Sequence, residues 1–108
     1  MTNIKNLTPH NIVVIVNDDI RYVITTSDSV ARCSSSTEVI GEVNGIPITR
    51  TIYGEIVGLP DPKENTIYIV STLVAQACPN RDDLFIPNEV VRDDSGKVIG
   101  CKSFGRIH

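Results

Sequence analysis

Short runs of β-branched residues, separated by polar turn signals, are the dominant pattern of the chain. Residues 12–16 are five β-branched residues in a row, which predicts a strand buried on both faces. A turn signal at residues 17–19 separates this run from residues 20–25, and a second break follows at 27–29. The two runs are therefore predicted to form a hairpin. Residues 66–70 have the same character and predict a central strand.

The clearest hairpin signal is Asn44-Gly45, which lies between residues 38–43 and 46–53. Asn-Gly favours a type I′ turn, because both central residues must adopt positive φ. Alternate positions of the second strand share one face, where Arg50 interrupts an otherwise apolar set of isoleucines at 46, 48 and 52. Pro47 predicts an edge position or a bulge near the turn.

A short helix is predicted for residues 71–78, directly after the central strand. Ser71 or Thr72 is a good N-cap for it. Pro79 ends the helix, because the residue before a proline is driven out of the α region.

These elements indicate the fold class. Many short strands, frequent turns and one short helix near residues 72–78 predict a mainly-β, or β-rich α+β, fold. We expect a small antiparallel barrel or sandwich, closed by a last hairpin around residues 93–96. The length of 108 residues predicts a single domain, 1–108, and 41% hydrophobic with 21% charged residues is typical of a folded chain.

Net charge and hydropathy exclude several classes of partner. The formal net charge of −3 gives no attraction for a nucleic acid polymer and is too weak for a mimic of DNA. No apolar run approaches the ~20 residues that span a bilayer, and the amino terminus lacks a signal-peptide pattern. We therefore expect no membrane association and a cytoplasmic location.

Cysteine spacing and motif content argue against a metal, a cofactor and catalysis. Cys33, Cys78 and Cys101 are odd in number and include no CxxC pair, so we expect reduced thiols, no bound metal and no cofactor. The chain has no P-loop, no Rossmann glycine pattern, no HExxH and no GxSxG motif. It is therefore expected not to be an enzyme.

Four positions combine polar chemistry with places where a ligand could bind. The ring of His10 could act as acid or base near neutral pH, or it could cap a strand end. Ser71 lies at a helix amino terminus, which suits a phosphate, but the hydroxyl can simply cap the helix. Arg81 could donate to a phosphate and Asp83 could accept from ribose hydroxyls, or the two could form a local ion pair.

Two arginines and a tyrosine in extended segments complete the candidate set. Arg32 and Arg50 need a binding partner if their face of the sheet is buried and need none if it is exposed. Tyr53 could stack on a nucleobase or pack at a strand edge. The predicted ligand-binding residues are His10, Arg32, Arg50, Tyr53, Ser71, Arg81 and Asp83.

Four segments carry a resemblance to a family of small proteins from phage and bacterial genomes. They are Asn6-Leu7-Thr8-Pro9-His10, Tyr53-Gly54-Glu55-Ile56-Val57-Gly58-Leu59-Pro60, Tyr68-Ile69-Val70-Ser71 with Val74-Ala75, and Arg81-Asp82-Asp83. The similarity covers nearly the whole chain, and its motifs name no chemistry. By a looser analogy of size and β-rich character, such proteins are similar to phage sponges that sequester nucleotide immune signals. These signals include cyclic ADP-ribose isomers and ADP-ribose conjugates, made by TIR-domain enzymes in Thoeris defence.

The resemblance implies a non-catalytic, phage-encoded protein that sequesters such a nucleotide signal in the infected bacterial host cell. We expect a homo-oligomer with sites between subunits, because a small chain gains concave surface at a symmetric interface. No sponge motif matches residue by residue, so the candidate positions rest on their chemistry.

Two alternatives stay open. One is an enzyme that cleaves a cyclic nucleotide with His10 as acid or base. The other is a protein-binding or structural phage module, whose Arg and Tyr side chains would be spread over unrelated surfaces. Convergence of Arg32, Arg50 and Arg81 in one pocket would weaken this last alternative.

Overall fold

The computed structural model describes residues 2–17, 20–27 and 29–107, so the expected turns at 17–19 and 27–29 fall partly outside the described residues. In chain order the elements are β1 (Asn3–Asn6), β2 (Ile12–Val16), β3 (Ile20–Ile24), β4 (Arg32–Val43), β5 (Ile46–Val57), β6 (Thr66–Ile69), α1 (Thr72–Ala77), β7 (Leu84–Arg92) and β8 (Val98–Gly105).

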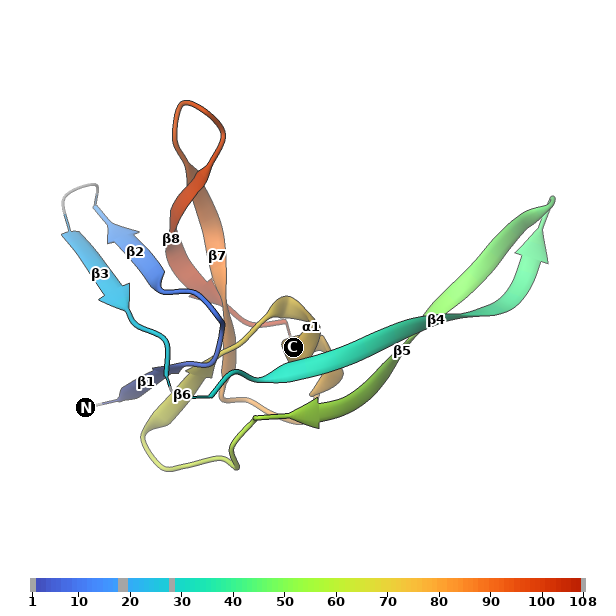
Figure 1. The fold of residues 1–108 in the computed structure, drawn as a ribbon, viewed down its shortest axis with the longest axis horizontal. Helices are drawn as coiled ribbons and strands as arrows, with labels where there is room; N and C mark the ends of the chain where they lie inside the picture. The colour runs from blue at the N-terminus through green and yellow to red at the C-terminus, as the bar shows by residue number, and fades with distance from the viewer. Residues whose placement is uncertain (1, 18–19, 28, 108) are drawn as a thin grey trace.

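A curled sheet forms the body of the molecule. In the described part of the chain, six strands pair in the order β1-β6-β7-β8-β2-β3. The chain after β3 returns to β1 through a parallel bridge between Asn6 and Thr26, so the sheet curls into a nearly closed barrel (Figure 1). Among the described strands, β4 and β5 pair only with each other, and they project from this barrel as an arm.

The predicted fold class, mainly β with one short helix near residues 72–78, is confirmed. The pairing is mixed. The hairpins β2–β3, β4–β5 and β7–β8 are antiparallel, whereas β1–β6, β6–β7 and β2–β8 are parallel. Parallel neighbours need a crossover connection rather than a tight turn. Helix α1 supplies that crossover between β6 and β7, a long-range relation that local turn signals do not reveal.

The core is centred on β6 and α1. Tyr68, Ile69 and Val70 are buried, and β6 is paired on both sides, as expected of a central strand. The strand β2 departs from its prediction: Ile12 and Val14 are buried, but the alternate positions are only half-buried. The expectation of burial on both faces is therefore wrong, because the second side of β2 borders clefts on the surface.

Helix α1 forms as the sequence predicts. The Ser71 hydroxyl oxygen accepts a hydrogen bond from the Val74 amide at 3.3 Å, which makes Ser71 the N-cap. The helix ends at Cys78, whose amide donates to the Ala75 carbonyl at 3.3 Å, and Pro79 prevents a further turn. Val74 and Ala75 are the buried positions of the helix, and they anchor it on the core.

The β4–β5 arm is longer than the sequence predicts, with twelve residues in each strand. Asn44 and Gly45 have φ values of 51° and 82°, which agrees with the predicted type I′ turn. The arm makes the molecule extended: its Cα radius of gyration is 16.6 Å, whereas a compact domain of this length has about 13 Å. The largest exposed element of the fold is therefore a two-stranded ribbon.

Gly58 marks the place where the arm rejoins the barrel. Its φ is +83°, and a Cβ at this position would collide with the backbone oxygen of Val30. Only glycine combines this backbone conformation with so close an approach. The two chain segments at the base of the arm, before β4 and after β5, thus pack closely against each other.

Candidate functional site

The Asn6 side chain joins three strands of the barrel. It is 1% exposed. Its Nδ2 donates to the backbone oxygens of His10 at 2.8 Å and Ile24 at 3.0 Å, and its Oδ1 accepts from the Thr8 amide at 2.9 Å. One side chain therefore links the end of β1 to the start of β2 and the end of β3. The segment Asn6–His10 therefore has a structural role.

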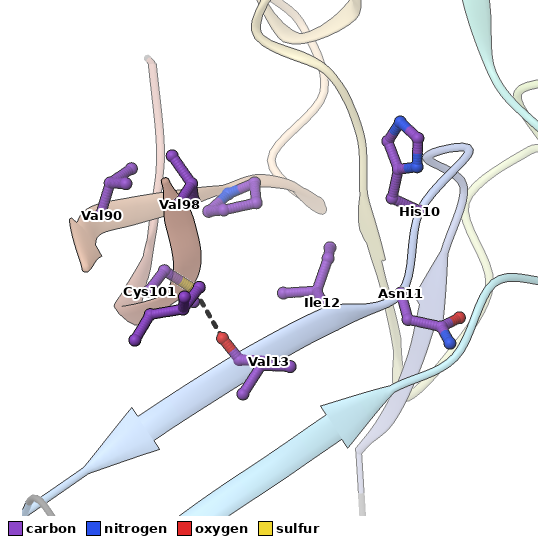
Figure 2. A pocket seen from close by; sticks show the side chains of 10 residues that line it. His10, Asn11, Ile12, Val13, Val90, Val98 and Cys101 are labelled. Carbon is purple, nitrogen blue, oxygen red and sulfur yellow. Dashed lines mark hydrogen bonds between the residues drawn. The ribbon is translucent and has the colours of Figure 1, made fainter. Parts of the chain in front are cut away.

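His10 is exposed and enters this network through its backbone oxygen rather than its ring. Figure 2 shows the ring at one end of a cleft, away from the valines that line the other end. Among the described residues, no side chain hydrogen-bonds to the ring. An acid–base catalyst is normally oriented by such a group, so the geometry does not favour catalysis by His10.

A cleft opens between the start of β2 and the β7–β8 hairpin, beside the point where β2 pairs with β8 at Val14 and Cys101. We call it the β2–β8 cleft; it has a volume of about 320 Å³, and its lining residues are His10, Asn11, Ile12, Val13, Pro87, Val90, Val98, Ile99, Gly100 and Cys101. Figure 2 shows aliphatic side chains around most of it. Such walls suit an apolar group and offer little to a diphosphate.

Cys101 lies at the base of the β2–β8 cleft and is not a candidate nucleophile. Its Sγ donates to the Val13 backbone oxygen at 3.7 Å (Figure 2). Burial raises the pKa of the Cys101 thiol. The nucleophile is the thiolate, which a raised pKa disfavours at neutral pH.

Arg81 and Asp83 form an ion pair within the chain. Arg81 Nε donates to Asp83 Oδ1 at 2.8 Å, and Nη2 donates to Asp83 Oδ2 at 2.9 Å and to the Pro60 carbonyl at 3.0 Å. The two side chains are only 19% and 12% exposed. The hydrogen bond from Arg81 holds the pKa of Asp83 below its usual range. The Arg81 guanidinium donors, which were predicted to bind a ligand, are thus largely used to hold the loop before β7.

Arg32 and Ser71 border one hollow of about 420 Å³, together with Pro9 and Cys33. The Arg32 side chain is exposed, and within the described residues no ion pair engages it. The Ser71 hydroxyl already caps α1. This hollow is the place where the fold brings together predicted ligand residues from distant parts of the sequence.

The two faces of the β4–β5 arm have different surroundings. The face turned to the barrel, here the inner face, contains Cys33, Ser35, Tyr53 and Ile56. Cys33 and Ile56 pack against the core, and the Tyr53 hydroxyl donates to Gln76 Oε1 of α1 at 3.3 Å. Tyr53 is therefore a contact between arm and helix.

The other face of the arm, here the open face, consists of four cross-strand rungs. They are Val43 with Ile46, Gly41 with Ile48, Glu38 with Arg50, and Ser36 with Ile52. The aliphatic side chains of this face, Val43, Ile46, Ile48 and Ile52, are 40–67% exposed. The charged rung is an ion pair, with Arg50 Nη2 3.0 Å from Glu38 Oε2.

The three arginines predicted to bind a ligand, Arg32, Arg50 and Arg81, do not share a pocket. Arg32 and Glu38, the partner of Arg50, are six positions apart on β4, which is about 20 Å along an extended strand. Arg81 is engaged by Asp83 on the loop before β7. This distribution is the one expected of a protein-binding or structural module.

Sequence reasoning missed the open face as a surface. The alternation of isoleucines at 46, 48 and 52 is visible in the sequence, but placing the hairpin within the barrel assigns that face to a core. Two signals could have corrected this: Arg50 lies in the middle of the set, and the facing strand carries the polar run Ser-Ser-Ser-Thr at residues 34–37. Both are unsuited to a buried face.

Comparison of the chain with protein-family models, with curated proteins and with solved structures finds no match. In the part of the chain that the structure describes, no helix has the length and apolar character needed to cross a bilayer. No group of three His, Cys, Asp or Glu side chains among the described residues is arranged to hold a metal ion.

Proposed function

We propose that this chain is a non-catalytic protein-binding module and that the β4–β5 arm is its binding element. The observation that carries the proposal is the open face. Val43, Ile46, Ile48 and Ile52 keep 40–67% of their surface in water, on a ribbon with no second layer among the described residues. Exposed apolar surface of this kind, here on both sides of one charged rung, is typical of protein interaction sites.

The stability of the arm supports the same proposal. A two-stranded ribbon in water is marginally stable, because it has no hydrophobic layer of its own to bury. Between residues 36 and 55 every described position is exposed. A partner that covers the open face would remove apolar surface from water and stabilise the ribbon.

Photo-crosslinking tests this proposal. A photo-reactive amino acid replaces Ile48 on the open face, and in a matched protein it replaces the neighbouring Thr49, which points to the other face. In cells that express the protein, the probe at 48 should crosslink to one polypeptide, identified by mass spectrometry, more strongly than the probe at 49. Adding Ile46→Asp should abolish that crosslink. If the probe at 48 crosslinks no more than a probe at Asp94, in the β7–β8 turn, the proposal is wrong.

A second candidate function keeps the nucleotide hypothesis. The observation that favours it is the hollow shared by Arg32 and Ser71, where an arginine without an internal ion pair could receive a phosphate. Sequestration of a cyclic ADP-ribose isomer or ADP-ribose conjugate, in the service of phage anti-defence against Thoeris, rests on the resemblance alone.

Ligand release tests the second candidate. The purified protein is incubated with a panel of cyclic dinucleotides and ADP-ribose signals, freed of unbound ligand and denatured. Mass spectrometry should then find one intact nucleotide, and Arg32→Ala should lose it while the exposed Arg21→Ala control retains it. A cleaved product would favour the His10 enzyme instead, and an empty result contradicts both.

A further inference from the structure

We infer that the partner of the arm is a second copy of this chain, packed open face to open face about a two-fold axis that runs along the arm. The inference rests on the proposed function and names its partner. The inference is based on the side chains of the four rungs of the open face, because those on β5 differ in size or charge from those on β4.

Two of the four rungs of the open face pair a large side chain with a small one. On β5 the positions are Ile48 and Ile52, and their neighbours on β4 are Gly41 and Ser36. A Cβ added at Gly41 would meet no atom within 4 Å, so there is open space above it. The open face therefore has a ridge along β5 and a groove along β4.

A two-fold rotation about the long axis of the arm exchanges the ridge and the groove. It places β5 of each copy over β4 of the other, so that Ile48 lies over the Gly41 groove of the second copy and Ile52 lies over its Ser36. Shape complementarity of this kind is what a symmetric, self-complementary interface requires.

The charged rung selects the same axis. Arg50 lies on β5 and Glu38 on β4. Rotation about the long axis brings each Arg50 over the Glu38 of the other copy, which adds an attraction of opposite charges. Rotation about an axis across the arm would bring Arg50 over Arg50 and Glu38 over Glu38, and like charges in an interface are strongly disfavoured.

The barrels do not obstruct this arrangement. The inner face of the arm is the one fixed to the barrel, through Ile56 on the core and Tyr53 on α1. The open face points the other way, so two copies can stack their arms with the barrels on the outer sides. Figure 1 shows the arm extending well clear of the sheet strands.

The area of the open face sets the expected strength. A two-stranded face of this length covers on the order of 500 Å² in each copy. The total of roughly 1,000 Å² is near the lower limit of a specific interface. We therefore expect a dimer with a dissociation constant of about micromolar order, visible by sedimentation as a concentration-dependent shift from monomer to dimer.

The test of the two-fold axis reverses the charges of Arg50 and Glu38, first one at a time and then together. Arg50→Glu alone gives a chain with two acidic residues in the charged rung, and Glu38→Arg alone gives a chain with two basic residues. Each variant by itself should sediment as a monomer at concentrations where the wild type is a dimer. An equimolar mixture of the two should form a heterodimer, because every contact between the copies is then acidic on basic. The chain that carries both substitutions should dimerise like the wild type.

Two further variants distinguish the loss of the proposed contact between copies from a loss of folding. Glu42→Arg makes the same charge change four residues along β4, on the other face beside Pro47, and should leave dimerisation unchanged. Gly41→Trp fills the groove at a position where a Cβ meets no atom of its own chain within 4 Å, and should give a folded monomer by circular dichroism.

Each outcome decides between the inference and the proposed function. A wild type that stays monomeric up to about 200 µM, far above a micromolar dissociation constant, overturns the inference, while a crosslink from position 48 to another protein would leave the proposed function standing. A wild-type dimer that the mixture of charge variants does not reproduce overturns the two-fold axis. A dimer that Gly41→Trp leaves intact, but that Val98→Asp breaks, would place the contact in the β2–β8 cleft and overturn the inference as well.

Discussion

The side chain of Asn6 illustrates how much of this fold depends on single polar residues. Its amide donates to two backbone oxygens of different strands and is 1% exposed. In Asn6→Ala both oxygens lose a partner where water has little access. We expect the free energy of unfolding to fall by about 2–4 kcal/mol, since each unsatisfied buried group costs about 1–3 kcal/mol. Urea denaturation followed by circular dichroism measures the loss.

A matched control for Asn6 lies five residues along the chain. Asn11 also uses its side chain to hold a backbone group, the Thr26 amide at 3.0 Å, but in an exposed position. Water can replace that bond, so Asn11→Ala should cost no more than about 1 kcal/mol. Equal losses in the two variants would contradict the structural role given to Asn6.

The Arg81–Asp83 pair makes part of the stability dependent on pH. Because Arg81 lowers the pKa of Asp83, the pair stabilises the fold above the unfolded-state pKa of about 3.9. That stability is lost as the pH falls through the lower folded-state pKa. Asp83→Asn should therefore cost about 1–2 kcal/mol at pH 7, and its difference from the wild type should shrink as the pH falls below about 4.

Urea midpoints for the wild type and Asp83→Asn at pH 7, 5 and 3 check this dependence. Asp82→Asn is the control, because Asp82 is the exposed neighbour. A difference between wild type and Asp83→Asn that stays constant down to pH 3 would show that the ion pair is not the cause.

At the residue scale, sequence reasoning identified side chains with chemistry but not their partners. Ser71 as a helix cap and the local pairing of Arg81 with Asp83 could be anticipated, because both depend on neighbours within three residues. Asn6 could not, because its acceptor on Ile24 is 18 residues away. Its importance appears only after β1, β2 and β3 have been assembled.

If a second copy covers the open face, amide hydrogen exchange in the β4–β5 arm should depend on the protein concentration. At low concentration the ribbon is exposed and its amides should exchange rapidly, as in other weakly packed elements. At concentrations about 100-fold above the dissociation constant, exchange along the arm should slow by about tenfold or more. Hydrogen–deuterium exchange with mass spectrometry measures this, with β6 as the internal reference.

Gly41→Trp provides the comparison for the exchange experiment. In this variant the arm should exchange at the fast rate at every concentration. Concentration-independent protection in the wild type would instead mean that the ribbon is stabilised within one copy, which would leave no need for a partner.

At the element scale, the local signals predicted the hairpins and the helix well. The Asn44-Gly45 turn, the Ser71 cap and the β2–β3 and β7–β8 hairpins all depend on short sequence separations. The parallel pairs and the projection of the arm depend on contacts between distant segments. The register Cys33 with Ile56, which joins the arm to the core, has no local signature.

At the scale of the whole molecule, the arm should be separable from the barrel. The described core residues lie in the barrel strands, in α1 and at their connections, and none falls between residues 34 and 55. Replacing residues 39–49 by Asn-Gly joins Glu38 to Arg50 through a two-residue turn of the type I′ kind. The exposed ribbon contributes little burial, so the free energy of unfolding should change by less than about 1 kcal/mol.

The shortened chain should also lose association. It keeps the inner-face residues Ile56 and Tyr53 but lacks two of the four rungs of the open face, Val43 with Ile46 and Gly41 with Ile48. Sedimentation should therefore show a monomer with the stability of the barrel. A loss of several kcal/mol would mean that the arm belongs to the folding unit, and a shortened chain that still dimerised would place the contact elsewhere. Separable stability together with lost association is the result that distinguishes a binding arm from a structural one, because only a binding arm can be removed without cost to the fold that carries it.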